Sequence, residues 1–153
     1  MQPFFTTYLN NLQEIHDEIR NAIKGLSQKA LDWTPGPEIN SMNALVIHLT
    51  GAERYWIGDV VAGDPAARDR EAEFKAQGLS EQDLLQRLDR NEEYFQKALG
   101  ALTLQELDAT RSVPRNGRSV SVGWALCHAL KHTSLHLGHM QIMRQLWEQQ
   151  QGR

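Results

Sequence analysis

The chain has 153 residues, 41% of them hydrophobic and 23% charged, which are ordinary values for a soluble globular protein. This length predicts one domain over residues 1–153 with a continuous core. The net charge of −3 gives no general attraction to nucleic acid or anionic lipid, so neither is expected as a partner. Short apolar stretches, no signal-peptide pattern and a single cysteine predict a cytoplasmic protein that does not span a membrane.

The first two predicted helices cover about residues 2–24 and 42–62. Apolar residues recur every three or four positions in the first helix, as on the buried face of a helix. The segment LDWTPGPEIN that follows contains two prolines and a glycine, which exclude a helix there. Ser41 is a good N-cap for the second helix, whose inward face is expected to include His48 and Tyr55.

A polar connection, GDPAARDREAEFKAQGL, separates the second predicted helix from the third. When extended, it is long enough to cross the bundle, so the second and third helices can be parallel. The third helix is expected to begin after Ser80, which with Asp83 resembles a capping box, and to end near Leu99.

A loop region precedes the fourth predicted helix, which extends from about Ser121 to Glu148. The loop contains a short turn at LTLQEL, and its segment RSVSV can pair briefly as a strand. It also contains Arg111, Arg115 and Arg118, which fit either a solvated loop or a clamp for a substrate carboxylate. Four helices around one core define an all-α four-helix bundle.

One face of the fourth helix carries four of the six histidines: His128, His132, His136 and His139. At about 100° per residue, they project within roughly 80° of one another. Four apolar residues share or flank this arc: Ala125, Ala129, Met143 and Leu146. The face is therefore expected to point to the core, where each imidazole needs hydrogen-bond partners or a metal ion.

Three histidines are candidate metal ligands. His132 and His136 are one helical turn apart and can bind one ion, and His48 on the second helix is the third candidate. Hydrogen bonding of these side chains within the core is the alternative. No Glu-x-x-His pair occurs, which argues against a di-iron bundle. Three neutral imidazoles leave an open coordination position, typical of catalytic sites, and suit Zn²⁺, Ni²⁺ or Fe²⁺.

The other three histidines and the cysteine are expected to have different roles. His128 and His139 are expected to be ligands, supporting groups or pocket lining. His16 lies at the edge of the first helix's apolar stripe and is expected at the surface or boundary. Cys127 is expected to be a buried thiol that packs between helices.

The segments NALVIHLTGAERYWI and HALKHTSLHLGHMQIMRQL resemble the DinB-like superfamily, and the likeness extends over nearly the whole chain. The resemblance implies an up-down-down-up four-helix bundle with a divalent metal bound by one histidine of the second helix and an HxxxH pair of the fourth. By position, these ligands are His48, His132 and His136. Leu137 and His139 stand where family members commonly have Arg and Gln, so the ligands are expected to match the family's, whereas the surrounding pocket need not.

The resemblance also implies a reaction class. Characterised relatives include S-transferases and a maleylpyruvate isomerase that use low-molecular-weight thiols. We therefore expect a metal-dependent transferase of the thiol S-transferase type, which acts on small molecules with such a thiol as cosubstrate. The alternatives are a non-catalytic, metal-stabilised stress-response bundle, a dimeric binding protein and a haem protein. A homodimer is expected, because exposed apolar strips on bundles favour pairing.

Overall fold

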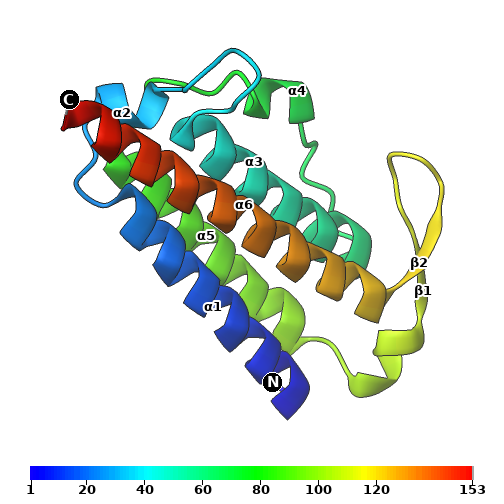
Figure 1. The fold of residues 1–153 in the computed structure, drawn as a ribbon. Coiled ribbons are helices and arrows are strands. Elements are labelled where there is room, and N and C mark those ends of the chain that lie inside the picture. Colours follow the sequence, from blue (N-terminus) through cyan, green and yellow to red (C-terminus); the bar gives the residue numbers. More distant parts are fainter. Residues whose placement is uncertain (153) are drawn as a thin grey trace.

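The computed structural model describes residues 1–152 and is mostly helical, which confirms the all-α class (Figure 1). The long helical segments are α1 (Pro3–Ile23), α3 (Met42–Glu53) continued by the π-helix η1 (Arg54–Ala62), α5 (Glu81–Gly100) and α6 (Val122–Gln151). The shorter elements are α2 (Gln28–Asp32), α4 (Arg70–Glu73), the 3₁₀ helix η2 (Leu104–Asp108) and the strands β1 (Thr110–Ser112) and β2 (Ser119–Ser121). In the described part of the chain, no helix has the length and apolar character needed to cross a membrane.

Serine side chains define the starts of three long helices. The hydroxyls of Ser41, Ser80 and Ser121 each accept a hydrogen bond from a backbone N–H of the following turn. Ser80 and Asp83 complete the capping box expected from the sequence. These caps confirm the predicted starts of the second, third and fourth helices.

The long helices run in two directions. Figure 1 shows α1 and α6 pointing one way, and α3 and α5 pointing the other. The Tyr8 hydroxyl joins α1 to α6 by donating to the Leu126 carbonyl at 2.9 Å. Arg87 joins α5 to α3 by donating to the Thr50 hydroxyl at 2.7 Å. The long connection between η1 and α5 allows two helices that are adjacent in the chain to run parallel.

The core consists of two apolar clusters. One packs Leu12, Trp56, Phe95 and Ala125 among others, and the second includes Ile19, Leu49, Leu88 and Met140. Buried polar residues lie between these positions on all four helices: His16, Glu53, Asn91 and Thr133. The middle of the core is therefore polar, although the sequence periodicity predicts an apolar stripe.

Several local expectations need correction. The polar connection contains the helix α4, and α2 includes the first residues of the segment LDWTPGPEIN, where no helix was expected. Helix α6 continues to Gln151, beyond the predicted end at Glu148. The expected strand pairing is confirmed, because β1 pairs antiparallel with β2 and Arg111 lies opposite Val120.

The histidine face of α6 is less buried than predicted. His128, His132 and His136 are half-buried, and His139 and Leu146 are exposed. Helix α6 packs against α1 and α3, so its core side is the one between these two helices. That side carries Ala125, Ala129, Thr133, Met140 and Met143. The histidines lie beside this strip, toward α3 and the polar connection.

Candidate metal centre

Three imidazoles from two helices converge. His48 projects from α3, and His132 and His136 project from consecutive turns of α6. One ring nitrogen of each lies within 4.8 Å of those of the other two, and the two Nε2 atoms of α6 are 3.3 Å apart. This group can hold a metal ion, and no other group of at least three His, Cys, Asp or Glu side chains in residues 1–152 converges in this way.

The two histidines of α6 are neutral at physiological pH. Burial, reinforced by the neighbouring imidazoles, lowers the pKa of His132 to about 3 and that of His136 to about 4. Their Nδ1 atoms are buried without a hydrogen-bond partner in the described part of the chain. Each ring thus has one buried nitrogen without a partner, and neutral rings with available lone pairs are what a divalent cation requires. The donor set therefore fits a metal ion.

An ionised carboxylate holds the ring of His48. The Nδ1 atom donates to Glu73 of α4 at 2.9 Å, which leaves Nε2 available as a ligand. Arg68 binds the same carboxylate through two N–H groups, at 2.6 and 2.7 Å. Burial raises the pKa of Glu73, but the hydrogen bonds from Arg68 and His48 outweigh it and lower that pKa. Gly51 leaves room for this carboxylate, because a Cβ at this position would collide with the Glu73 side chain as it lies here.

Residues of the polar connection that complete this site were missed by the sequence analysis. Glu73 orients His48, and the ring of Phe74 stacks on the His48 ring with centroids 4.4 Å apart. The available signal was the segment DREAEF. Asp69 caps α4 by accepting from the backbone N–H of Ala72, and acidic residues follow in the first turn, as is typical of a helix start.

The other two histidines of the face lie outside the cluster. The His128 ring stacks on Trp124 with centroids 4.8 Å apart, and its centroid is 6.1 Å from that of His132. His139 is exposed, with its ring centroid 5.4 Å from that of His136. His128 lines a cavity of about 210 Å³ beside the cluster, whereas His139 lines a separate apolar hollow.

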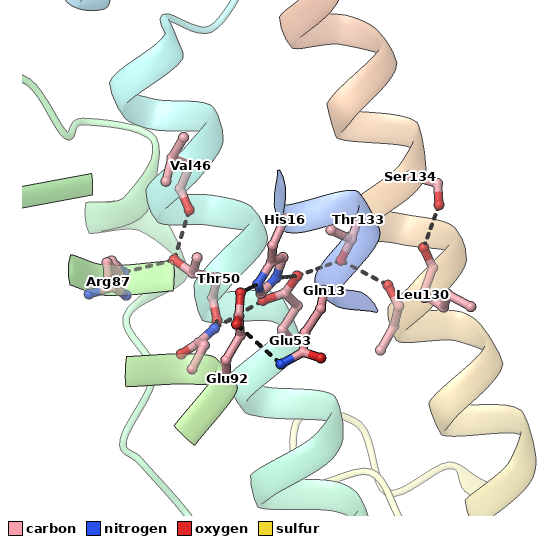
Figure 2. Close-up of polar contacts among 12 residues, drawn as sticks. Gln13, His16, Val46, Thr50, Glu53, Arg87, Glu92, Leu130, Thr133 and Ser134 are labelled. Atoms are coloured by element: carbon pink, nitrogen blue, oxygen red, sulfur yellow. Dashed lines mark hydrogen bonds and ion pairs between the residues drawn. The ribbon is translucent and has the colours of Figure 1, made fainter. Parts of the chain in front are cut away.

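His16 is fully buried, so its predicted place at the surface or boundary is wrong. Figure 2 shows it between two carboxylates: Nε2 is 3.0 Å from Glu53 and Nδ1 is 2.8 Å from Glu92. Burial lowers the pKa of His16, but the two carboxylates outweigh it and raise that pKa to about 9. Glu53 also accepts from Thr133 at 2.8 Å and from Asn91 at 3.0 Å. We call these five residues the His16 network.

Cys127 is exposed, which contradicts its predicted role as a buried packing thiol. It follows the fully buried Leu126 on α6, and the helical turn of one position carries it out of the contact with α1 and α3. Cys127 does not belong to the histidine cluster.

The three loop arginines have different environments. Arg111 lies in β1, where it donates to the Val61 carbonyl. The Arg118 guanidinium lies 4.4 Å from the centre of the Trp124 ring. Only Arg115 of the three lines the cavity beside His48.

Comparison with known proteins identifies the family. Residues 7–149 match the family model for mycothiol-S-transferase. The chain belongs to the mycothiol-S-transferase family. This family lies in the DinB-like superfamily, so the resemblance seen in the sequence is confirmed. No curated protein sequence matches the chain.

Two solved structures resemble this member of the mycothiol-S-transferase family. A conserved protein from Enterococcus faecalis has a TM-score of 0.76 and 15% identity, covering 95% of this chain and 98% of that one. A DinB-like protein from Bacillus cereus ATCC 10987 has a TM-score of 0.74 and 14% identity, covering 92% of this chain and 91% of that one. At these identities, the likeness shows the fold alone.

Proposed function

We propose that this protein is a divalent-metal-dependent transferase of the thiol S-transferase type, with the metal held by His48, His132 and His136. The observation that carries the proposal is the convergence of three imidazoles from two helices, beside a cavity and with one ring held by a carboxylate. The family supports the reaction class and points to mycothiol, or a thiol like it, as the cosubstrate.

Zn²⁺, Ni²⁺ and Fe²⁺ all suit three imidazole ligands. Such an ion would act as a Lewis acid that lowers the pKa of a bound thiol or water, so that a nucleophile exists near neutral pH. The chain's own residues prepare the site. Glu73 fixes the tautomer and orientation of His48, and Phe74 covers one face of its ring.

The neighbouring cavity provides room for small substrates. Its wall includes His48 and His132 together with Tyr55 and Trp56 of the π-helix η1. π-helical turns are rare and occur frequently at functional sites, where they redirect side chains. The location of η1 therefore supports substrate binding directly beside the proposed metal ligands.

The finer architectural expectations are part of the same proposal. We propose that the long helices form the up-down-down-up four-helix bundle as one domain, and the helix directions in Figure 1 support this. We also propose a cytoplasmic homodimer with small-molecule substrates and no nucleic-acid partner. The exposed apolar side chains of Leu135 and Ile142 on α6 support the pairing of two copies.

A thiol-transfer assay tests the proposed activity. Mycothiol and 1-chloro-2,4-dinitrobenzene would be mixed with the protein loaded with Zn²⁺, Ni²⁺ or Fe²⁺. The new sulfur–carbon bond replaces the carbon–chlorine bond, and chloride and the thiol proton are released. We expect thioether formation above the uncatalysed rate, lost on chelation and in His136→Ala. Stoichiometric metal without turnover for any thiol and electrophile would contradict the transferase and favour the non-catalytic binding protein.

A further inference from the structure

The cavity of about 210 Å³ beside the histidine cluster has a positively charged wall. His48 and His132 form the part of the wall shared with the cluster. Arg68, Arg70 and Arg115 form much of the rest, and none of the lining residues is an aspartate or a glutamate. A cavity lined in this way attracts anions.

Two of these arginines differ from the third in their ion pairing. Arg68 donates twice to Glu73, so that carboxylate largely compensates its charge. The Arg70 guanidinium lies 4.8 Å from the centre of the Phe74 ring. Within the described chain, no carboxylate lies in ion-pair distance of Arg70 or Arg115. The wall therefore presents two uncompensated guanidinium groups.

These two arginines come from segments far apart in the sequence. Arg70 begins α4 in the long connection, and Arg115 lies in the turn between β1 and β2. The backbone N–H of Arg115 donates to the hydroxyl of Tyr55 at 3.1 Å, which ties this turn to the π-helix at the cavity. Their convergence on one cavity is a property of the tertiary structure and not of a local run of charge.

We infer that this cavity is an anion subsite that binds the carboxylate of a small substrate through Arg70 and Arg115. The inference rests on the proposed function, because it assigns the cavity to a substrate of the same site. Guanidinium groups match carboxylates by paired N–H donors. The ring of Trp56 packs against that of His128 at 4.6 Å between centroids, and both line the cavity, so they offer an aromatic surface to the apolar part of such a substrate.

Benzoate and benzamide are suitable probes, because they have nearly the same shape and differ in charge. Their dissociation constants would be measured by calorimetry, on metal-free and metal-loaded protein at fixed ionic strength. We expect benzoate to bind metal-free protein at least about tenfold more tightly than benzamide. Arg70→Gln and Arg115→Gln should each weaken benzoate binding by roughly threefold to tenfold and leave benzamide binding unchanged.

Arg118→Gln is the matched control, because it makes the same change three positions from Arg115 and does not line the cavity. Equal weakening of benzoate binding by Arg118→Gln and Arg115→Gln would overturn the inference. Metal content is measured on the same samples. Benzoate selectivity in a protein that binds no metal would refute the proposed metal site and leave the anion subsite. Metal binding without selectivity for the acid in either probe pair would support the metal site and overturn the subsite.

The carboxylate can belong to the thiol or to the electrophile. A second titration of metal-loaded protein would compare 3-mercaptopropionate with 3-mercaptopropanamide. Tighter binding of the acid, reduced in Arg115→Gln, supports the subsite and assigns it to the thiol. Selectivity for benzoate over benzamide, without selectivity in the thiol pair, supports the subsite and assigns it to the electrophile. Equal binding of acid and amide in both pairs overturns the inference.

Discussion

The histidine cluster (His48, His132 and His136) and the His16 network both contain imidazoles inside the bundle, but the partners of their ring nitrogens differ. In the cluster, the Nε2 atoms of His132 and His136 face each other, and their Nδ1 atoms lack partners in residues 1–152. In the network, both nitrogens of His16 meet carboxylates. The pKa values move accordingly, to about 3 and 4 in the cluster and about 9 in the network.

This difference suits the His16 network to a structural role and the histidine cluster to binding an ion. His16 is protonated and fully hydrogen-bonded, so it pairs with the buried Glu53 and the half-buried Glu92 and needs no further partner. The cluster instead brings one ring nitrogen from each of three imidazoles within 4.8 Å of one another, an arrangement that can hold a metal ion. The two regions are also coupled, because Thr133 of the His16 network is adjacent to His132 and binds Glu53 of α3. The network thus holds α3 and α6 at the spacing that brings His48 to the other two histidines.

The largest expected effect comes from removal of a proposed ligand. His136→Ala should weaken Zn²⁺ binding by more than about a hundredfold, since loss of a direct ligand exceeds the usual effect of losing a supporting hydrogen bond. Competition with a chromogenic chelator would measure the affinity. His139→Ala is the control one turn away and should keep wild-type affinity. Equal losses of Zn²⁺ affinity in the two variants would show that His136 is no more important for metal binding than the neighbouring His139.

Glu53→Gln should destabilise the fold by about 3 kcal/mol, because it removes the buried counter-ion of His16, leaves only the half-buried Glu92, and weakens the link to Thr133. Urea unfolding followed by circular dichroism would measure this change. Glu93→Gln, on the exposed side of α5, is the matched control and should change stability by less than about 0.5 kcal/mol. Unchanged stability of Glu53→Gln would show that the network is not part of the scaffold.

Glu73→Gln should weaken Zn²⁺ binding by about tenfold to a hundredfold, less than loss of a ligand, because His48 remains but loses its anionic hydrogen-bond acceptor. The exposed Glu71 on the same short helix offers the control Glu71→Gln, for which no change is expected. An affinity in Glu73→Gln equal to wild type would mean that the carboxylate does not support the cluster.

A pH dependence of stability is also expected. The folded pKa of His16, about 9, lies above its unfolded value of 6.5, so the folded state binds more protons between these values. The stabilisation is complete below pH 6.5 and is lost as the pH rises through 9. We expect the free energy of unfolding of metal-free protein to fall by about 3 kcal/mol over this range. His16→Gln should abolish that slope, and a wild-type curve that is flat or rises would contradict the account.

Much of the fold was predictable, since helix caps and apolar spacing are local. Ser41, Ser80 and Ser121 predicted three helix starts that the structure confirms. The spacing of His132 and His136 on one helix likewise required only helical geometry. The meeting of these histidines with His48 required the assumption of a bundle.

The missed features depend on tertiary contacts. Glu73 reaches His48 only because the polar connection folds back over α3, and no local pattern specifies that path. His16 is buried because α1 places it against carboxylates of α3 and α5, although its sequence neighbourhood is that of a boundary position. Cys127 is exposed because the packing of α6 on α1 and α3 determines which face of α6 is buried.

The metal content of the purified protein tests the central claim most directly. Inductively coupled plasma mass spectrometry would be applied to wild type, His48→Ala and His136→Ala after equilibration with equal concentrations of Zn²⁺, Ni²⁺ or Fe²⁺. The account predicts about one divalent ion per wild-type chain and little or none in either variant, with the helical circular dichroism spectrum retained. Wild-type protein without stoichiometric metal, or variants that retain it, would contradict the claim that these three histidines form a metal centre.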